Sequence, residues 1–152
     1  MPSIREKILA NVADTLALIK IDNGYEVDIL AVERAPRNPT NQTVLPCVQI
    51  LDYGEDKEDG VPAQFVSCII HLGILFWNDA YEDTSTRAGQ IQASIERALS
   101  LDQHRNNLAI DTDIIGNEFY IEEEHLSIIG GIVKVDISYR HYYGDPYNPV
   151  AS

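Results

Sequence analysis

The chain has 152 residues, 45% of them hydrophobic, which is enough apolar material for the core of one ordinary domain and argues against disorder throughout. Eleven basic and 24 acidic residues give a net charge of −13. This excess of acid argues against binding nucleic acid or an anionic membrane, because both need clustered Lys and Arg. It is compatible with solubility, with cationic partners or with a surface that repels DNA.

The N-terminal segment does not have the pattern of a signal peptide, because charges between Arg5 and Asp14 interrupt any continuous apolar stretch. The apolar run 68–77 is too short to span a bilayer and contains a histidine. Cys47 and Cys68 both lie in apparent strands. We expect them to be free, buried thiols in a reducing cytoplasm, with a disulfide as the alternative.

The spacing of apolar residues predicts a first helix over 3–19, capped by Ser3, with Glu6 completing a capping box. Its buried stripe should consist of Ile8, Leu9, Val12, Leu16 and Ile19. A turn at Asn23-Gly24 and a strand over 25–32 should follow. The three prolines of 33–46 predict a loop.

Next we expect a short strand over 47–52, an acidic turn over 53–62 and a long strand over 64–77. The even positions of the long strand, 66 to 76, all suit a core. Its odd positions include four large apolar residues, Phe65, Ile69, Leu75 and Trp77. The second face is therefore too apolar to be bare, which suggests that partners cover it.

A second helix should begin at Thr84 or Ser85, with an apolar stripe from Ala88 to Leu99, and 100–113 should be irregular or weakly helical. Two strands, 118–128 and 132–142, should close the domain through a hairpin turn at Gly130-Gly131, with a bulge across 122–124. Because strands follow one another directly, the order predicts a single α+β domain. We expect a mainly antiparallel sheet of about five strands with two helices packed on one face.

No pattern in the sequence predicts catalysis, a metal site or a cofactor site. It has no phosphate-binding loop and no nucleophile elbow, and its histidines are not spaced as zinc ligands. His71, inside a strand, suits a satisfied or interfacial histidine better than a catalyst. Four residues fit positions of a calcium loop, namely Asp111, Asp113, Gly116 and Glu122. Ile115 stands where an oxygen ligand is needed, so an acidic turn leading into a strand is the expectation.

In order of elements, nearly the whole chain resembles the tail terminator, or tail completion, proteins of long-tailed bacteriophages. The resemblance rests on the capped first helix, the "GYEVDI" and "ERAPRNP" segments, the long apolar strand, the second helix and a closing strand that leads into "GDPYNP". The residues that match best are Tyr139, Arg140, Gly144, Asp145, Pro146 and Tyr147. The acidic segment 55–59 and the segment 100–117 have no counterpart in it.

The resemblance implies a structural virion protein rather than an enzyme, assembled in the host cytoplasm. Six copies would form a ring that caps the tail tube protein, meets the head completion or neck protein and lets DNA pass through its bore. Six copies of −13 give −78 on one ring, and an acidic bore would keep phosphate from adhering. The alternative is that the charge serves solubility alone.

Twelve residues are candidates for the assembly interface. They are Arg34, Pro36, Arg37, Phe65, Ile69, Leu75, Trp77, Tyr142, Tyr143, Asp145, Pro146 and Tyr147. Residues 143–152 would be a docking tail, whose tyrosines and prolines suit an interface and order at low entropic cost. The alternatives are a tail folded back on its own domain and arginines that are merely solvated.

Two other functions remain open on the sequence. Another phage neck or head–tail adaptor would share the acidic, oligomeric character, and a small non-viral binding module or enzyme is the third class. Size exclusion with mass measurement separates them, because a discrete ring favours the first two and a monomer with a ligand favours the third.

Overall fold

The computed structural model describes residues 2–34, 46–59, 64–79, 84–121 and 128–150. Its elements in order are α1 (Ile4–Ala17), a short 3-10 helix η1 (Ile21–Asn23), β1 (Ala31–Glu33), β2 (Cys47–Asp59), β3 (Phe65–Asp79), α2 (Thr84–Ser100), β4 (Asp111–Ile121), β5 (Ile128–Tyr142) and β6 (Asp145–Pro149). The strands form one sheet in the order β1-β2-β3-β5-β4, with β6 paired to β5. Among the described strands, β1 and β2 are the only neighbours that run parallel.

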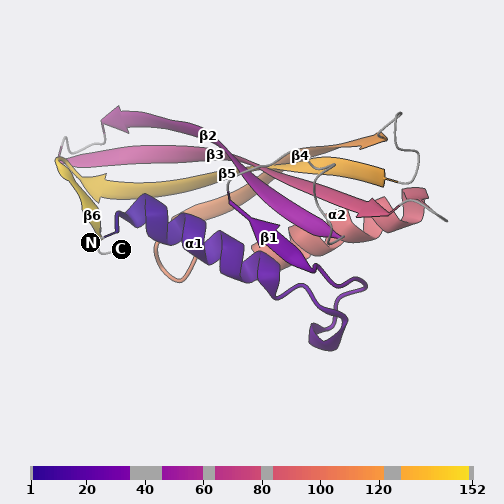
Figure 1. Cartoon of the computed structure of the whole chain (residues 1–152). Coiled ribbons are helices and arrows are strands. Elements are labelled where there is room, and N and C mark those ends of the chain that lie inside the picture. Colours follow the sequence, from indigo (N-terminus) through magenta and orange to yellow (C-terminus); the bar gives the residue numbers. More distant parts are fainter. Residues whose placement is uncertain (1, 35–45, 60–63, 80–83, 122–127, 151–152) are drawn as a thin grey trace.

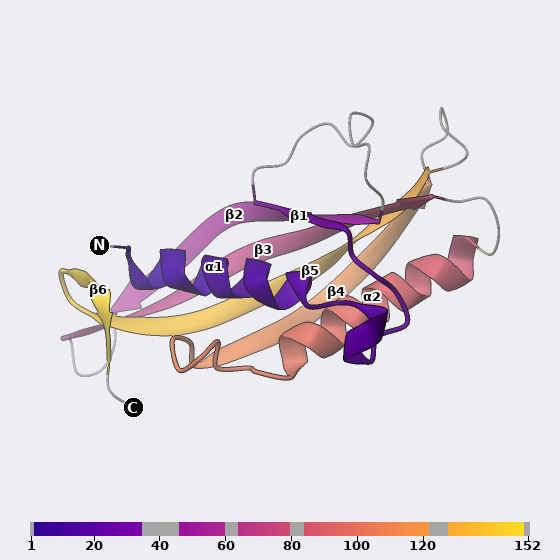
Figure 2. The same cartoon turned by 60° about the horizontal axis from the view of Figure 1, so that its bottom comes forward.

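Both helices lie on the same face of the curved sheet (Figure 1), and the turned view brings both in front of it, with α2 near β4 (Figure 2). The α+β class, the mainly antiparallel sheet and the placement of the helices are therefore confirmed. The sheet has six strands instead of about five, because the C-terminal segment adds β6.

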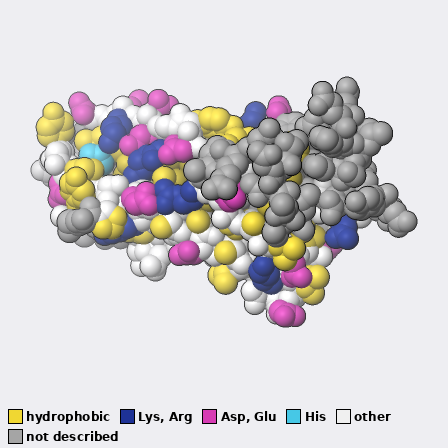
Figure 3. Space-filling model, in the orientation of Figure 1, with side chains coloured by type: hydrophobic (Ala, Val, Ile, Leu, Met, Phe, Trp, Pro, Cys, Tyr) yellow, Lys and Arg dark blue, Asp and Glu magenta, His cyan; other side chains and the backbone are white. Residues whose placement is uncertain are grey.

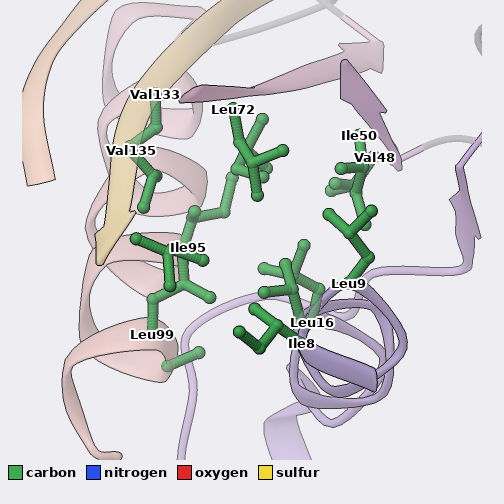
Figure 4. Close-up of a cluster of buried hydrophobic side chains, with 14 of the residues drawn as sticks. Ile8, Leu9, Leu16, Val48, Ile50, Leu72, Ile95, Leu99, Val133 and Val135 are labelled. Carbon is green, nitrogen blue, oxygen red and sulfur yellow. The ribbon is translucent and has the colours of Figure 1, made fainter. Parts of the chain in front are cut away.

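The core lies between the helices and the alternate residues of β3 and β5. The even residues from Val66 to Phe76 and the odd residues from Val133 to Tyr139 face the helices and are buried. The apolar stripes of both helices are buried as predicted. Figure 4 shows Leu72 and Val135 from the sheet with Ile95 of α2, opposite the apolar side chains of α1. Cys47 and Cys68 are buried free thiols, as expected.

The cap of α1 forms only half of the predicted capping box. The Ser3 hydroxyl accepts a hydrogen bond from the Glu6 amide at 3.1 Å. The Glu6 carboxylate, however, binds the Arg34 guanidinium through two contacts of 2.5 and 2.8 Å, so it faces away from the Ser3 amide. The two charge-assisted bonds to Arg34 are stronger than the single bond to the Ser3 amide that would complete the capping box, so they replace it.

The hairpin turn predicted at Gly130-Gly131 is wrong, because both glycines lie inside β5. Gly130 pairs with Trp77 and Gly131 with Phe76. A Cβ on Gly130 would lie 2.6 Å from the Trp77 ring, and one on Gly131 would lie 2.6 Å from the Phe76 ring. The glycines therefore provide room for two large rings that cross β5 on opposite faces of the sheet.

The acidic turn predicted over 53–62 is also wrong for the part that the structure describes, since β2 continues to Asp59. The strand bends at a bulge between Asp52 and Glu55, where Gly54 has φ +93°. Within the described residues, β1 covers only 31–33 opposite 47–49, so the rest of β2 pairs with β3 alone. Acidic residues are tolerated there because an edge strand is solvated on one side.

The strand predicted over 25–32 is mostly wrong, and only Ala31–Glu33 is extended in the sheet. The preceding residues are held by local contacts instead. The Ile29 amide donates to the Ile19 carbonyl at 2.9 Å, and the Asp28 carboxylate accepts from the Ile21 amide at 2.7 Å. These bonds satisfy backbone amides without pairing to another strand. Val27 and Ile29 in this segment are buried.

The segment between α2 and β4 is organised by Arg105, whose side chain is fully buried. Its guanidinium donates to the Leu99 carbonyl at 2.6 Å and to the Asp102 carbonyl at 2.8 Å, so it satisfies the end of α2. Arg105 and the next two residues all have positive φ. β4 then begins at Asp111, seven residues before the predicted start, and its bulge lies between Ile114 and Gly116. The bulge predicted at 122–124 falls outside the described residues.

The C-terminal segment pairs with its own domain. β6 runs antiparallel to β5, with His141 opposite Pro149 and Tyr142 opposite Asp145, after a turn at Gly144 with φ +77°. It also contacts α1. The C-terminal segment therefore folds back on its own domain, which was the alternative to a docking tail. A docking role for its exposed tyrosine rings stays a prediction.

Candidate assembly surface

The sheet face opposite the helices carries a histidine held between two carboxylates. His71 on β3 lies 2.7 Å from Asp136 of β5 through Nδ1 and 2.8 Å from Asp56 of β2 through Nε2. Both ring nitrogens face carboxylate oxygens, an arrangement that favours the protonated ring, which donates through both nitrogens. These hydrogen bonds raise the pKa of His71. The histidine therefore ties three strands together on this face.

Aromatic rings gather where β3 begins and β5 ends, and we call Phe65, Arg140, Tyr142 and Tyr143 the terminal patch. The rings of Phe65 and Tyr142 lie 5.3 Å apart, and the Arg140 guanidinium lies 5.8 Å from the centre of the Phe65 ring. The Tyr143 amide donates to the Gln64 carbonyl at 2.8 Å. Tyr142 is 40% and Tyr143 74% exposed, so large rings face solvent on an ordered backbone.

The other predicted interface residues of β3 are exposed to different extents. Ile69 is 39% exposed and lies on the face opposite the helices, and Leu75 on the same face is half-buried. Trp77 is only 8% exposed because its ring lies over Gly130. Ile69 and Leu75 can contact a partner as they stand, whereas Trp77 supports the sheet from within.

In the tail, the predicted interface residues order the turn. The Asp145 carboxylate accepts from the Tyr147 amide at 3.2 Å and from the Asn148 side chain at 3.1 Å, and the hydrogen bond from Asn148 is the main cause that lowers the pKa of Asp145. Pro146 is half-buried, and Tyr147 remains 44% exposed. Tyr147 on β6 is therefore a third exposed tyrosine, after Tyr142 and Tyr143 of the terminal patch.

Arg34 is engaged within its own chain, through the pair with Glu6 described above. The hydrogen bond that Arg34 donates to Glu6 raises the pKa of Arg34. A contact between Arg34 and a neighbouring subunit stays a prediction, and it would have to compete with this pair. Pro36 and Arg37 lie outside the described residues.

Sequence reasoning missed a network of charges between α1 and the bulged part of β2. Arg5 binds Asp52 at 2.5 Å and lies 3.7 Å from Glu55. The Tyr139 hydroxyl donates to Glu55 at 2.7 Å, and Lys57 lies 3.6 Å from the same carboxylate. Burial raises the pKa of Tyr139. Figure 3 shows basic and acidic side chains alternating over this part of the surface. No pattern in the sequence pointed to this network, because its members meet only through the β2 bulge.

The edge strand β4 was also missed as a surface. Asp111 and Asp113 are exposed, and the apolar Ile115 and Phe119 are 55% and 49% exposed. Phe119 lies edge-on to Phe76, with ring centres 6.2 Å apart. The partial calcium-loop pattern was the only sequence signal in this segment. Asp111, Asp113 and Gly116 lie in an extended strand, and Glu122 falls outside the described residues. Among the described residues, no three His, Cys, Asp or Glu side chains converge as metal ligands would.

Comparison with known proteins adds little to this geometry. No protein-family model matches the chain, and no curated protein matches it. It is similar to a solved chain described as "Virion of native gene transfer agent (GTA) particle", with a TM-score of 0.40 and 9% identity over 90% of each chain. A likeness this weak carries no argument about fold or function. In the described part of the chain, no helix is long and apolar enough to cross a membrane.

Proposed function

We propose that this chain is a structural subunit of a phage-like virion, and more narrowly a tail terminator. The terminal patch carries the proposal: the rings of Phe65 and Tyr142 pack together at one end of the sheet, and Tyr142 and the neighbouring Tyr143 are 40% and 74% exposed. Exposed rings on a rigid backbone are typical of interface anchors. The order of the elements and the "GDPYNP" tail agree with the resemblance to tail terminators.

In this function the fold acts as a rigid subunit of a ring. Both helices cover one face of the sheet, which leaves the opposite face, the β4 strand and the terminal patch for neighbours. Six copies would close on the end of the tail tube, stop its growth and offer the upper side of the ring to the neck protein. The acidic excess of each chain would keep DNA from adhering to the bore during passage.

Tube capping tests the proposal. The purified chain is added at increasing ratios to tail tube protein from the same particle while the tube polymerises, and tube lengths are measured by electron microscopy. A terminator shortens the tubes and leaves a ring of density at one end. Tubes of unchanged length without end density would contradict the proposal. A matched control uses the chain with Tyr142 and Tyr143 changed to Ser, which should fold but not cap.

A further inference from the structure

Arg140 is a cation for which the described residues provide no counter-ion. It lies over the Phe65 ring, and its Nε is buried without a hydrogen-bond acceptor. Among the described residues no ion pair includes it, although the chain has 24 acidic residues. A buried donor without an acceptor is destabilising, and buried donors are rarely left so in folded proteins. The guanidinium of the terminal patch is therefore free to accept a carboxylate of a partner as its counter-ion.

Asp113 on β4 is the reverse case. It is exposed and lies directly opposite Asp136 of β5, and like charges in that position repel. The described part of the chain offers it no cation in an ion pair. On the same strand Ile115 exposes apolar surface, whereas Phe119 lies on the helix-bearing face beside Phe76. β4 therefore has both features that suit the terminal patch: a carboxylate without a cation, in Asp113, and an apolar contact, in Ile115.

Near its bulge, the acidic strand β2 does not offer an equivalent surface, because its carboxylates there are occupied. Asp52 is bound by Arg5, and Asp56 is bound by His71. Glu55 lies near Arg5 and Lys57. If any of these three carboxylates paired with another subunit, it would have to give up its present partner. Glu58 and Asp59 at the end of β2 have no ion pair in the described part of the chain, but they lie opposite Ser67 and Val66, beside the terminal patch, and so form no separate surface.

We propose that the terminal patch of one subunit receives the β4 strand of a second copy of this chain, with Arg140 pairing with Asp113. This inference rests on the proposed function, since it names the surfaces that would join the ring. Two β4 strands placed together would bring like charges together, so the contact joins two different surfaces. A contact of that type continues from copy to copy and closes into a ring when the rotation permits.

A charge swap tests the pairing. Three variants are compared with the wild type by native mass spectrometry and sedimentation over a range of concentrations: Arg140→Glu, Asp113→Arg, and the two combined. Each single reversal sets like charges against each other and should weaken assembly at least about tenfold. The combined variant restores opposite charges at every contact and should assemble nearly as the wild type does.

Arg87→Glu is the matched control, because it makes the same change in net charge on an exposed turn of α2 and should leave assembly unchanged. Far-ultraviolet dichroism checks that all variants fold, and Arg140→Gln replaces Arg140→Glu if the latter does not. Rings that form equally well from both single variants would overturn this inference alone. Failure of the combined variant to recover would also overturn the pairing. A wild-type chain that stays monomeric would overturn the inference together with the ring.

Discussion

Gly130 and Gly131 make room for the rings of Trp77 and Phe76, so the smallest substitution there should be costly. We expect Gly131→Ala to lower the free energy of unfolding by about 1–3 kcal/mol, because the new Cβ would lie 2.6 Å from the Phe76 ring and 2.7 Å from the Glu118 carbonyl. The carbonyl belongs to the backbone of β4 and cannot move aside without disturbing the ladder. Urea unfolding of the variant measures the change.

Gly89 supplies the control for that experiment. It lies in α2, and a Cβ there would meet nothing within 4 Å. Gly89→Ala should raise the free energy of unfolding by about 0.5–1 kcal/mol, since alanine is the better helix former. Equal effects of the two substitutions would contradict the packing described around Gly131.

His71 makes stability depend on pH in a defined direction. Its pKa in the folded chain is raised above 6.5 by the hydrogen bonds to Asp56 and Asp136. A raised pKa means that the stabilisation is fully present below the unfolded value and is lost as pH rises through the folded value. Relative to His71→Gln, the wild type should therefore melt higher at about pH 5.5 and lose that advantage at about pH 9.

Asp56→Asn checks the cause of the His71 effect. It keeps the shape of the side chain but removes one of the two carboxylates on the ring. The pH dependence attributable to His71 should shrink without disappearing, because Asp136 remains. A difference between wild type and His71→Gln that is the same at both pH values would show that the imidazolium bridge does not contribute.

At the scale of elements, β6 stabilises the domain that it follows. It pairs with β5 at His141 and Tyr142 and contacts α1, and His141 is only 5% exposed. Deleting residues 143–152 should lower the melting temperature by several degrees, as expected for a loss of about 1 kcal/mol in a domain of this size. Differential scanning calorimetry of the truncated chain measures it, and an unchanged melting temperature would contradict a stabilising role for β6.

Tyr143→Ser separates the structural role of the tail from a docking role. Tyr143 is 74% exposed, so its replacement should change the free energy of unfolding by no more than about 0.5 kcal/mol. Assembly, followed by native mass spectrometry, should nevertheless weaken if the terminal patch is an interface. Assembly equal to that of the wild type would remove Tyr143 from the interface.

The elements that could be predicted are those whose apolar pattern matches one buried face. The stripes of α1 and α2 and the even positions of β3 are strictly periodic, and they are buried in the structure. β2 beyond Asp52 could not be predicted, because its charges satisfy each other across the bulge instead of marking a loop. The Gly130-Gly131 pair is typical of a turn when the sequence is considered alone. Only the register with Phe76 and Trp77 shows that the rings of these two residues pack over the glycines.

The candidate site was predictable in its rings and not in its charges. Phe65 was selected as an apolar residue of a strand and Tyr142 as an amphipathic ring suited to an interface, and the ladder between β3 and β5 brings them together. The isolation of Arg140 and Asp113 depends on which charges find partners in space. Sequence spacing does not encode that for residues on different strands.

For the whole molecule, the helices lie on one face of the sheet, and surfaces suited to contact lie on β4 and at the end of β5. These two surfaces differ in charge, which favours contact between unlike surfaces over contact between like ones. We therefore expect assembly to give closed rings instead of symmetric dimers.

Cryo-electron microscopy of the purified wild-type chain tests the central claim most directly. We predict class averages of a single closed ring with an open bore, and a particle mass six times that of the chain. The ring should form without added metal or cofactor. Particles of monomer size at concentrations used for imaging, or two-fold dimers joined through like surfaces, would contradict the account.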